Sequence, residues 1–89
     1  MKISINRIIK EFLAEIIQDL SKYLNRCVVM NVEKNEILTF NNIDEVKKYI
    51  RDKKGIFIMI QIPSREEIIT EDSFELMIKN ITGREVILK

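Results

Sequence analysis

Residues 55–63 read GIFIMIQIP, an almost unbroken apolar run with glycine before it and proline after it. Every second residue from Ile56 to Ile62 is isoleucine, and β-branched residues are enriched in strands. A run without polar alternation is typical of a strand that is buried on both faces. We therefore expect this strand to be central in a sheet and the remaining chain to cover its two faces.

The N-terminal segment, from Ser4 or Asn6 to about Asn25, has the apolar periodicity of a long amphipathic helix. Either Ser4 or Asn6 is a suitable N-cap, and a short strand at residues 2–5 before a later helix start is the alternative. The apolar stripe spans about half of the helix circumference, more than the ~100° that a surface helix buries. The extra width indicates either contacts with another helix or an interface with a partner protein or a second copy. The candidate interface residues are Ile5, Ile9, Phe12, Leu13, Ile17, Tyr23 and Leu24.

The middle of the chain predicts a hairpin followed by a helix. Strands are expected at residues 27–33 and 36–40, joined at Lys34 and Asn35, because asparagine tolerates the positive φ of a tight turn. Asn42 and Glu45 then have the spacing of a capping box, which predicts a second helix over residues 43–54. The glycine that follows is expected to be the C′ residue of that helix.

The segment after the apolar run allows two interpretations. Ser64 and Glu67 form another capping box, so a helical turn is expected there. Residues 73–82 have helical spacing with a suitable cap at each end, but they also alternate as a strand. The caps and the period favour the helix, and residues 84–89 are expected to form a last strand in either case.

The element order α-β-β-α-β-(α)-β indicates a single α+β domain over residues 1–89, with a roughly four-stranded, mainly antiparallel sheet and two or three helices. We expect the first two helices on one face of the central strand and the helix at 73–82 on the other. If residues 73–82 formed a strand instead, one face of the central strand would be uncovered. Its candidate interface residues would then be Phe57, Met59 and Gln61.

Length, charge and cysteine usage limit the function classes. The chain has 89 residues and a formal net charge of +1, so it has no overall electrostatic attraction to nucleic acid or membranes. Its single cysteine cannot form an internal disulfide, and its N-terminus lacks the apolar core of a signal peptide. No apolar run approaches the ~20 residues that span a bilayer. We therefore expect a soluble cytoplasmic protein without a membrane partner.

The sequence lacks the residue types that most catalytic and metal sites use. It contains no histidine, so no Ser-His or Cys-His pair can form, and Cys27 in an apolar strand is expected to be a core residue. One cysteine without histidine cannot bind zinc, and two glycines cannot form a phosphate-binding loop. An acidic cluster is the remaining candidate for a Mg²⁺ or acid–base site, although charge runs are usually solvated loops. Its members are Glu66, Glu67, Glu71, Asp72 and Glu75. We expect no catalytic activity, cofactor, metal or small-molecule substrate.

Charge is segregated along the second half of the chain. Five bases and one acid lie in residues 47–54, around Tyr49, and acids dominate residues 66–75. The bases are Lys47, Lys48, Arg51, Lys53 and Lys54. As a functional site they would bind the phosphates of nucleic acid while Tyr49 stacked on a base; as a structural feature they would compensate the helix dipole. The opposite blocks would also suit a contact with a protein or between two copies of the chain.

These observations favour a non-catalytic protein-interaction module, a small regulator or inhibitor that binds a larger protein or self-associates as a dimer. Its size suits a protein carried by a phage or a mobile element. The alternative is a small nucleic-acid-binding regulator that uses the basic segment 47–54.

Overall fold

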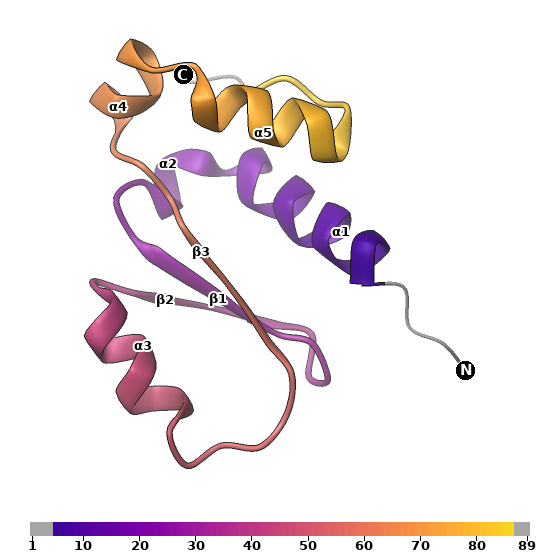
Figure 1. Ribbon diagram of the computed structural model, residues 1–89, viewed down its shortest axis with the longest axis vertical. Helices are drawn as coiled ribbons and strands as arrows, with labels where there is room; N and C mark the ends of the chain where they lie inside the picture. The colour runs from indigo at the N-terminus through magenta and orange to yellow at the C-terminus, as the bar shows by residue number, and fades with distance from the viewer. Residues whose placement is uncertain (1–4, 87–89) are drawn as a thin grey trace.

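The computed structural model describes residues 5–86, in which helices lie on both faces of a three-stranded antiparallel sheet (Figure 1). The α+β class that the element order predicts is therefore confirmed. In chain order, the elements are α1 (Ile5–Gln18), α2 (Leu20–Tyr23), β1 (Cys27–Asn31), β2 (Glu36–Phe40), α3 (Ile43–Ile50), β3 (Phe57–Gln61), α4 (Arg65–Thr70) and α5 (Ser73–Thr82).

β1 is the central strand of the sheet, with β2 along one edge and β3 along the other. All five residues of β1 are buried, because it has a neighbour on each side and helices over both faces. The apolar run at residues 55–63 contributes β3, which lies at the edge of the sheet. The prediction that this run is the central strand is therefore wrong. The prediction that the strand is buried on both faces is also wrong, because every residue of β3 is half-buried or exposed. A continuous apolar run indicates apolar surroundings on both faces, but it does not indicate how many strands pair with the run.

Alternate residues of β1 belong to two separate cores. Val28 and Met30 face α1, together with Ile58 of β3. Cys27 and Val29 face the opposite way, toward α3. The expectation that the first two long helices share a face is wrong, since α1 and α3 cover opposite faces of the sheet (Figure 1).

α5 packs on α1, on the side of that helix that faces away from the sheet (Figure 1). Through this contact, Phe74 and Ile78 of α5 belong to the same buried cluster as Phe12 and Ile16 of α1 and Val28 of β1. This contact explains the wide apolar stripe of the first helix, which has to meet the sheet on one side and a second helix on the other. It also means that α5 does not cover the second face of the sheet, as had been expected.

Several helix ends lie where the capping residues predict them. The side chain of Asn42 accepts a hydrogen bond from Glu45 N at 3.0 Å at the start of α3. At the start of α4, Ser64 Oγ accepts one from Glu67 N at 3.2 Å. Gly83 ends α5 in the left-handed conformation, with a φ of 74°, so the helical interpretation of this segment is confirmed.

Two helices differ from their predicted extents. The first is interrupted at Asp19, which separates α1 from α2, and its proposed N-cap Ser4 lies outside the described residues. α3 ends at Ile50 instead of residue 54, and Gly55 is therefore not its C′ residue. Residues 51–54 carry no apolar side chain that would hold another helical turn against the sheet.

Within residues 5–86, the sheet has three strands instead of the four predicted. Residues 84–86 are not in a strand, and the rest of the predicted last strand lies outside the described residues. The first predicted strand ends earlier, at Asn31, and residues 32–35 form the turn to β2. Asn31 Oδ1 accepts a hydrogen bond from Lys34 N at 3.2 Å, and Asn35 has the positive φ expected of it, 53°.

Candidate functional site

Among residues 5–86, no strand pairs with the outer edge of β3, which leaves that edge of the sheet open. In an antiparallel pair, residues that hydrogen-bond to the neighbouring strand alternate with residues whose N–H and C=O groups point away from it. Ile56 O accepts a hydrogen bond from Val32 N at 3.0 Å, beside the start of β3. At the other end, Ile62 N donates to Arg26 O at 3.0 Å, so the even-numbered residues bond toward β1. The residues whose backbone groups point outward are therefore Phe57, Met59 and Gln61.

Apolar grooves flank this edge on both faces of the sheet. On the α3 face, a groove of about 240 Å³ is lined chiefly by Ile43, Val46, Ile50, Phe57 and Met59. On the α1 face, a groove of about 360 Å³ is lined by Ile5, Ile8, Val32, Ile56, Phe57 and Ile58. An edge strand with apolar surface on both sides is a template for pairing with another strand.

Large apolar side chains that border the two grooves are exposed to solvent. Met59 and Ile56, beside the open edge itself, are 44% and 52% exposed. Ile43 and Ile5, across the two grooves, are 47% and 59% exposed. Single exposed apolar residues are ordinary, but apolar residues that gather along one surface mark an interaction site.

α3 covers only part of its face of the sheet, which explains the first groove. The helix contacts mainly β1 and β2, and its Val46 is buried against Val29 of β1. It does not extend over β3 in the same way, so Phe57 is half-buried and Met59 is exposed. The eight-residue length of α3 thus leaves the side chains of the edge strand without cover.

Tyr49 belongs to an aromatic cluster on the α3 face. Its ring centroid lies 5.3 Å from that of Phe40 and 6.5 Å from that of Phe57, the latter in an edge-to-face arrangement. Lys53 Nζ lies 4.4 Å from the Tyr49 ring centroid, as in a cation–π contact. The ring is therefore engaged within the chain and does not stand ready to stack on a nucleic-acid base.

Cys27 is a buried side chain that helps to fix the far end of β3. It is 1% exposed, and its Sγ donates a hydrogen bond to Gln61 Oε1 at 2.7 Å. Gln61 Nε2 in turn donates to the backbone oxygen of Ile62 at 3.1 Å. These contacts hold the Gln61 side chain against the sheet while its backbone faces the open edge.

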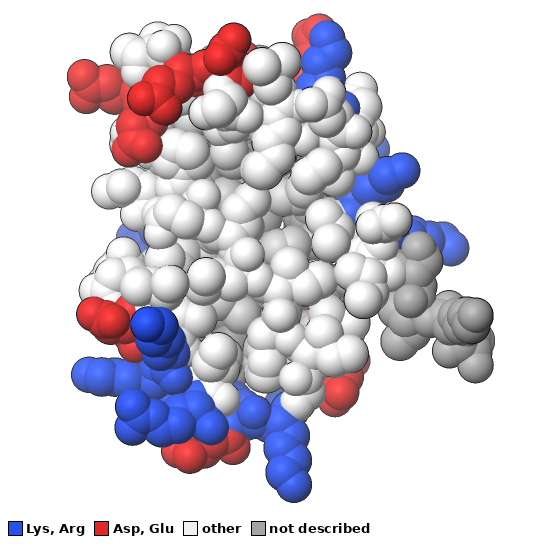
Figure 2. Space-filling model, in the orientation of Figure 1, with Lys and Arg blue, Asp and Glu red and all other residues white. Residues whose placement is uncertain are grey.

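The two charge blocks lie at opposite ends of β3. Figure 2 shows basic side chains gathered over the end of α3 and the following turn, and acidic side chains over α4. The surface between them in this view is largely uncharged. All five basic side chains predicted as a phosphate site are exposed: Lys47, Lys48, Arg51, Lys53 and Lys54. Within residues 5–86, no ion pair joins the two blocks.

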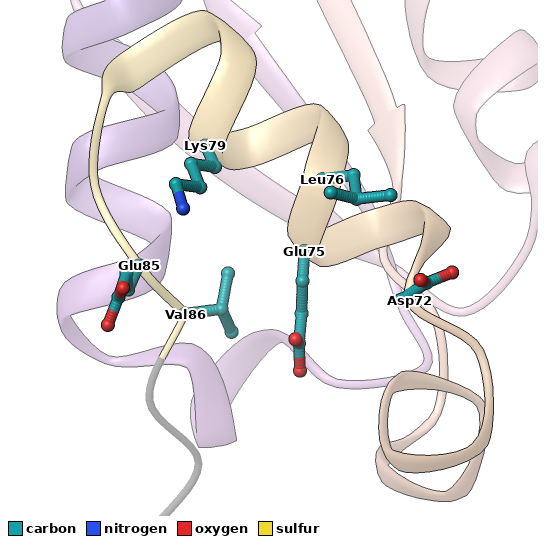
Figure 3. A pocket seen from close by; sticks show the side chains of 6 residues that line it. All are labelled: Asp72, Glu75, Leu76, Lys79, Glu85 and Val86. Atoms are coloured by element: carbon teal, nitrogen blue, oxygen red, sulfur yellow. The ribbon is translucent and has the colours of Figure 1, made fainter.

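The acidic block does not converge on a metal site. In the part of the chain that the structure describes, no three acidic or cysteine side chains are grouped so that they would hold a metal ion. An open hollow of about 340 Å³ beside α5 is lined by Asp72, Glu75, Leu76, Lys79, Glu85 and Val86 (Figure 3). The carboxylates of Asp72 and Glu85 point away from this hollow on opposite sides. They therefore do not form a pair for acid–base work.

The structure distributes the residues that the sequence marks as an interface on the first helix. Three are buried in the chain's own core: Phe12, Leu13 and Tyr23. Three are half-buried: Ile9, Ile17 and Leu24. Ile5 is exposed and lines the groove on the α1 face, so it is the member of the set that the fold brings to the β3 edge.

Sequence reasoning missed Ile43 and Ile56, and it raised Met59 for a different reason. Met59 was expected to be uncovered only if residues 73–82 formed a strand. These residues form a helix, yet Met59 is still exposed, because α5 packs on α1 instead of on the sheet. The unbroken apolar run was the one sequence signal of this surface. To identify it as an exposed edge, the order of the strands in the sheet had to be known.

Comparison with protein-family models, with curated proteins and with solved structures found no match. Among residues 5–86, no helix has both the length and the apolar composition needed to cross a bilayer.

Proposed function

We propose that this chain is a non-catalytic protein-interaction module, a small regulator that binds its partner by strand addition at the β3 edge. The observation that carries the proposal is the outward-pointing backbone of Phe57, Met59 and Gln61 between two apolar grooves. In strand addition, main-chain hydrogen bonds supply affinity and the flanking pockets select alternate side chains. Both elements are present along this edge.

The non-catalytic part of the proposal rests on the available chemistry. The chain has no histidine, and its single thiol is buried and hydrogen-bonded to Gln61. The hollow beside α5 is lined by three carboxylates, one lysine and two apolar side chains, and it has no serine, cysteine or histidine among its lining residues (Figure 3). None of these arrangements provides a nucleophile with an adjacent base.

A proline at the open edge tests the proposal. Met59→Pro removes an outward N–H and leaves the bonds to β1 intact, so the domain is expected to fold while strand addition is weakened. In affinity capture from an extract of the cells that carry this chain, the wild-type bait is expected to enrich a partner that the Met59→Pro bait loses. Circular dichroism checks that the variant is folded.

Thr39→Pro provides the matched control on the opposite edge. Since alternate residues of β1 bond to β3, those between them bond to β2, and Thr39 of β2 therefore points its N–H away from the sheet. This variant is expected to keep the partner. A partner that survives Met59→Pro, or that is lost equally with both prolines, would show that the β3 edge is not the binding surface.

The exposed basic segment 47–54 supports a second candidate function, a small regulator that binds nucleic acid through its phosphates. With five bases in contact, affinity for DNA or RNA is expected to fall about 500-fold between about 50 and about 200 mM salt. Lys47→Glu/Arg51→Glu is expected to abolish the binding, and base sequence is expected to have little effect, since Tyr49 is engaged elsewhere. Fluorescence anisotropy with labelled oligonucleotides measures both. Absence of binding at the lower salt concentration would rule this candidate out.

A further inference from the structure

We propose that the strand that occupies the β3 edge is β3 of a second copy of this chain, paired antiparallel about a two-fold axis at Met59. This inference rests on the proposed function and names its partner. The two sheets would then join into one continuous sheet through their β3 edges. An isologous contact of this kind uses the same surface of both copies, so it has to be self-complementary. Three properties of the edge meet that requirement.

The first property is the backbone pattern. Phe57, Met59 and Gln61 point their N–H and C=O groups outward, and Met59 lies midway between the other two. In an antiparallel pair centred there, Met59 lies opposite Met59 of the second copy, and each Phe57 lies opposite a Gln61. All outward backbone groups of the strand then find partners, because donors and acceptors at every one of these positions are exchanged in pairs.

The second property is the charge at the two ends of the strand. The basic turn with Lys53 and Lys54 precedes β3, and the acidic residues of α4 and its flanks follow it (Figure 2). An antiparallel pair brings the start of one β3 to the end of the other, so base meets acid at both ends of the interface. A parallel pair would bring base to base and acid to acid. The charge pattern therefore favours the two-fold arrangement and a partner that carries the same pattern.

The third property is the apolar surface near the axis. Met59 is 44% exposed in the single chain, and across the axis it would lie beside the same side chain of the second copy. The α3-face groove of each copy borders this position, because Phe57 and Met59 line it. Pairing thus removes from water the apolar side chains that α3 is too short to cover.

Charge reversal at the two ends tests the arrangement. Lys53→Glu/Lys54→Glu changes the net charge of residues 47–54 from +4 to 0, and Glu66→Lys/Glu71→Lys changes that of residues 65–75 from −4 to 0. Each double variant is expected to self-associate with a Kd raised about tenfold or more, since the attraction between unlike charges is removed at both ends. In an equal mixture, the acidic block of the first variant meets the basic block of the second at one end of the interface, and a heterodimer is expected to form in preference to either homodimer.

Analytical ultracentrifugation over a range of concentrations measures these states. The wild-type chain is expected to reach twice its mass of 10.6 kDa. Met59→Asp is expected to be a folded monomer, because two carboxylates would meet at the axis. Glu11→Lys/Glu15→Lys, which reverses two exposed charges on α1 away from the edge, is the control and is expected to remain dimeric.

Three outcomes would overturn the inference: a wild-type chain that is monomeric at all concentrations, a Met59→Asp variant that still dimerises, or charge variants whose mixture stays monomeric. Different outcomes would show that the proposed function itself is wrong. A monomeric wild type whose captured partner is lost with Met59→Pro would leave the interaction edge in place with a different occupant. A monomer that captures no edge-dependent partner would contradict both.

Discussion

Val29→Asp is expected to unfold this domain, whereas Met59→Asp at the residue directly opposite is expected to leave it folded. Val29 and Met59 are cross-strand partners in β1 and β3, and their side chains lie on the same face of the sheet. Val29 is 0% exposed and Met59 is 44% exposed. An unpaired carboxylate at Val29 costs several kcal/mol, a large part of the ~5–15 kcal/mol that stabilises a typical domain.

Far-UV circular dichroism and thermal unfolding measure this difference. Val29→Asp is expected to lose the cooperative transition or to shift it far downward, while Met59→Asp retains a cooperative transition and a folded spectrum. The same introduced side chain in the same cross-strand pair makes each variant the control for the other. Equal destabilisation by both would show that β3 is as deeply buried as β1, and would contradict both the strand order and the open edge.

Ile78→Ala is expected to cost about 2–5 kcal/mol of unfolding free energy, because it leaves a cavity where α5 meets α1. Ile78 is 0% exposed and belongs to the same cluster as Phe12 and Ile16. This substitution tests whether residues 73–82 form a helix that packs on α1. Urea denaturation followed by circular dichroism measures the change as a shift in the midpoint at unchanged slope.

Leu76→Ala is the matched control for this substitution. It removes the same number of carbon atoms from the same helix, and alanine improves helix propensity at both positions. Leu76 is 51% exposed, so its substitution is expected to cost about 1 kcal/mol or less. If residues 73–82 paired as a strand, 76 and 78 would lie on the same face and the two costs would be similar. That result would refute the packing of α5 described here.

Local signals predicted most of the helix starts and turns, because each depends on only a few neighbouring residues. Asn42 and Ser64 cap helices through hydrogen bonds to backbone groups three residues away. Gly83 and Asn35 adopt the positive φ that their residue types tolerate. Helix lengths were less accurate, since α3 stops at Ile50 where contact with the sheet ends.

The candidate site was less predictable than the elements. The sequence indicates the two charge blocks and the apolar run, but not that the run is an edge strand between them. The interface predicted on the first helix rested on stripe width, and three of its residues are buried in the chain's own core. The width of an apolar stripe shows how much of a helix surface needs to be buried. It does not show whether the surface that buries it belongs to the same chain or to another one.

By itself, the apolar run at residues 55–63 determined that a strand is present there and that both of its faces are apolar. Its side chains alternate between the two faces, so their composition reports on the layers above and below the sheet. The tertiary structure alone decided that this strand lies at an edge, because pairing is made by backbone groups that every residue carries. β1 and β3 are both mainly apolar and carry the same backbone groups, so their sequences do not show which is central. Only the strand order β2-β1-β3 places β1 at the centre and leaves the outer edge of β3 open.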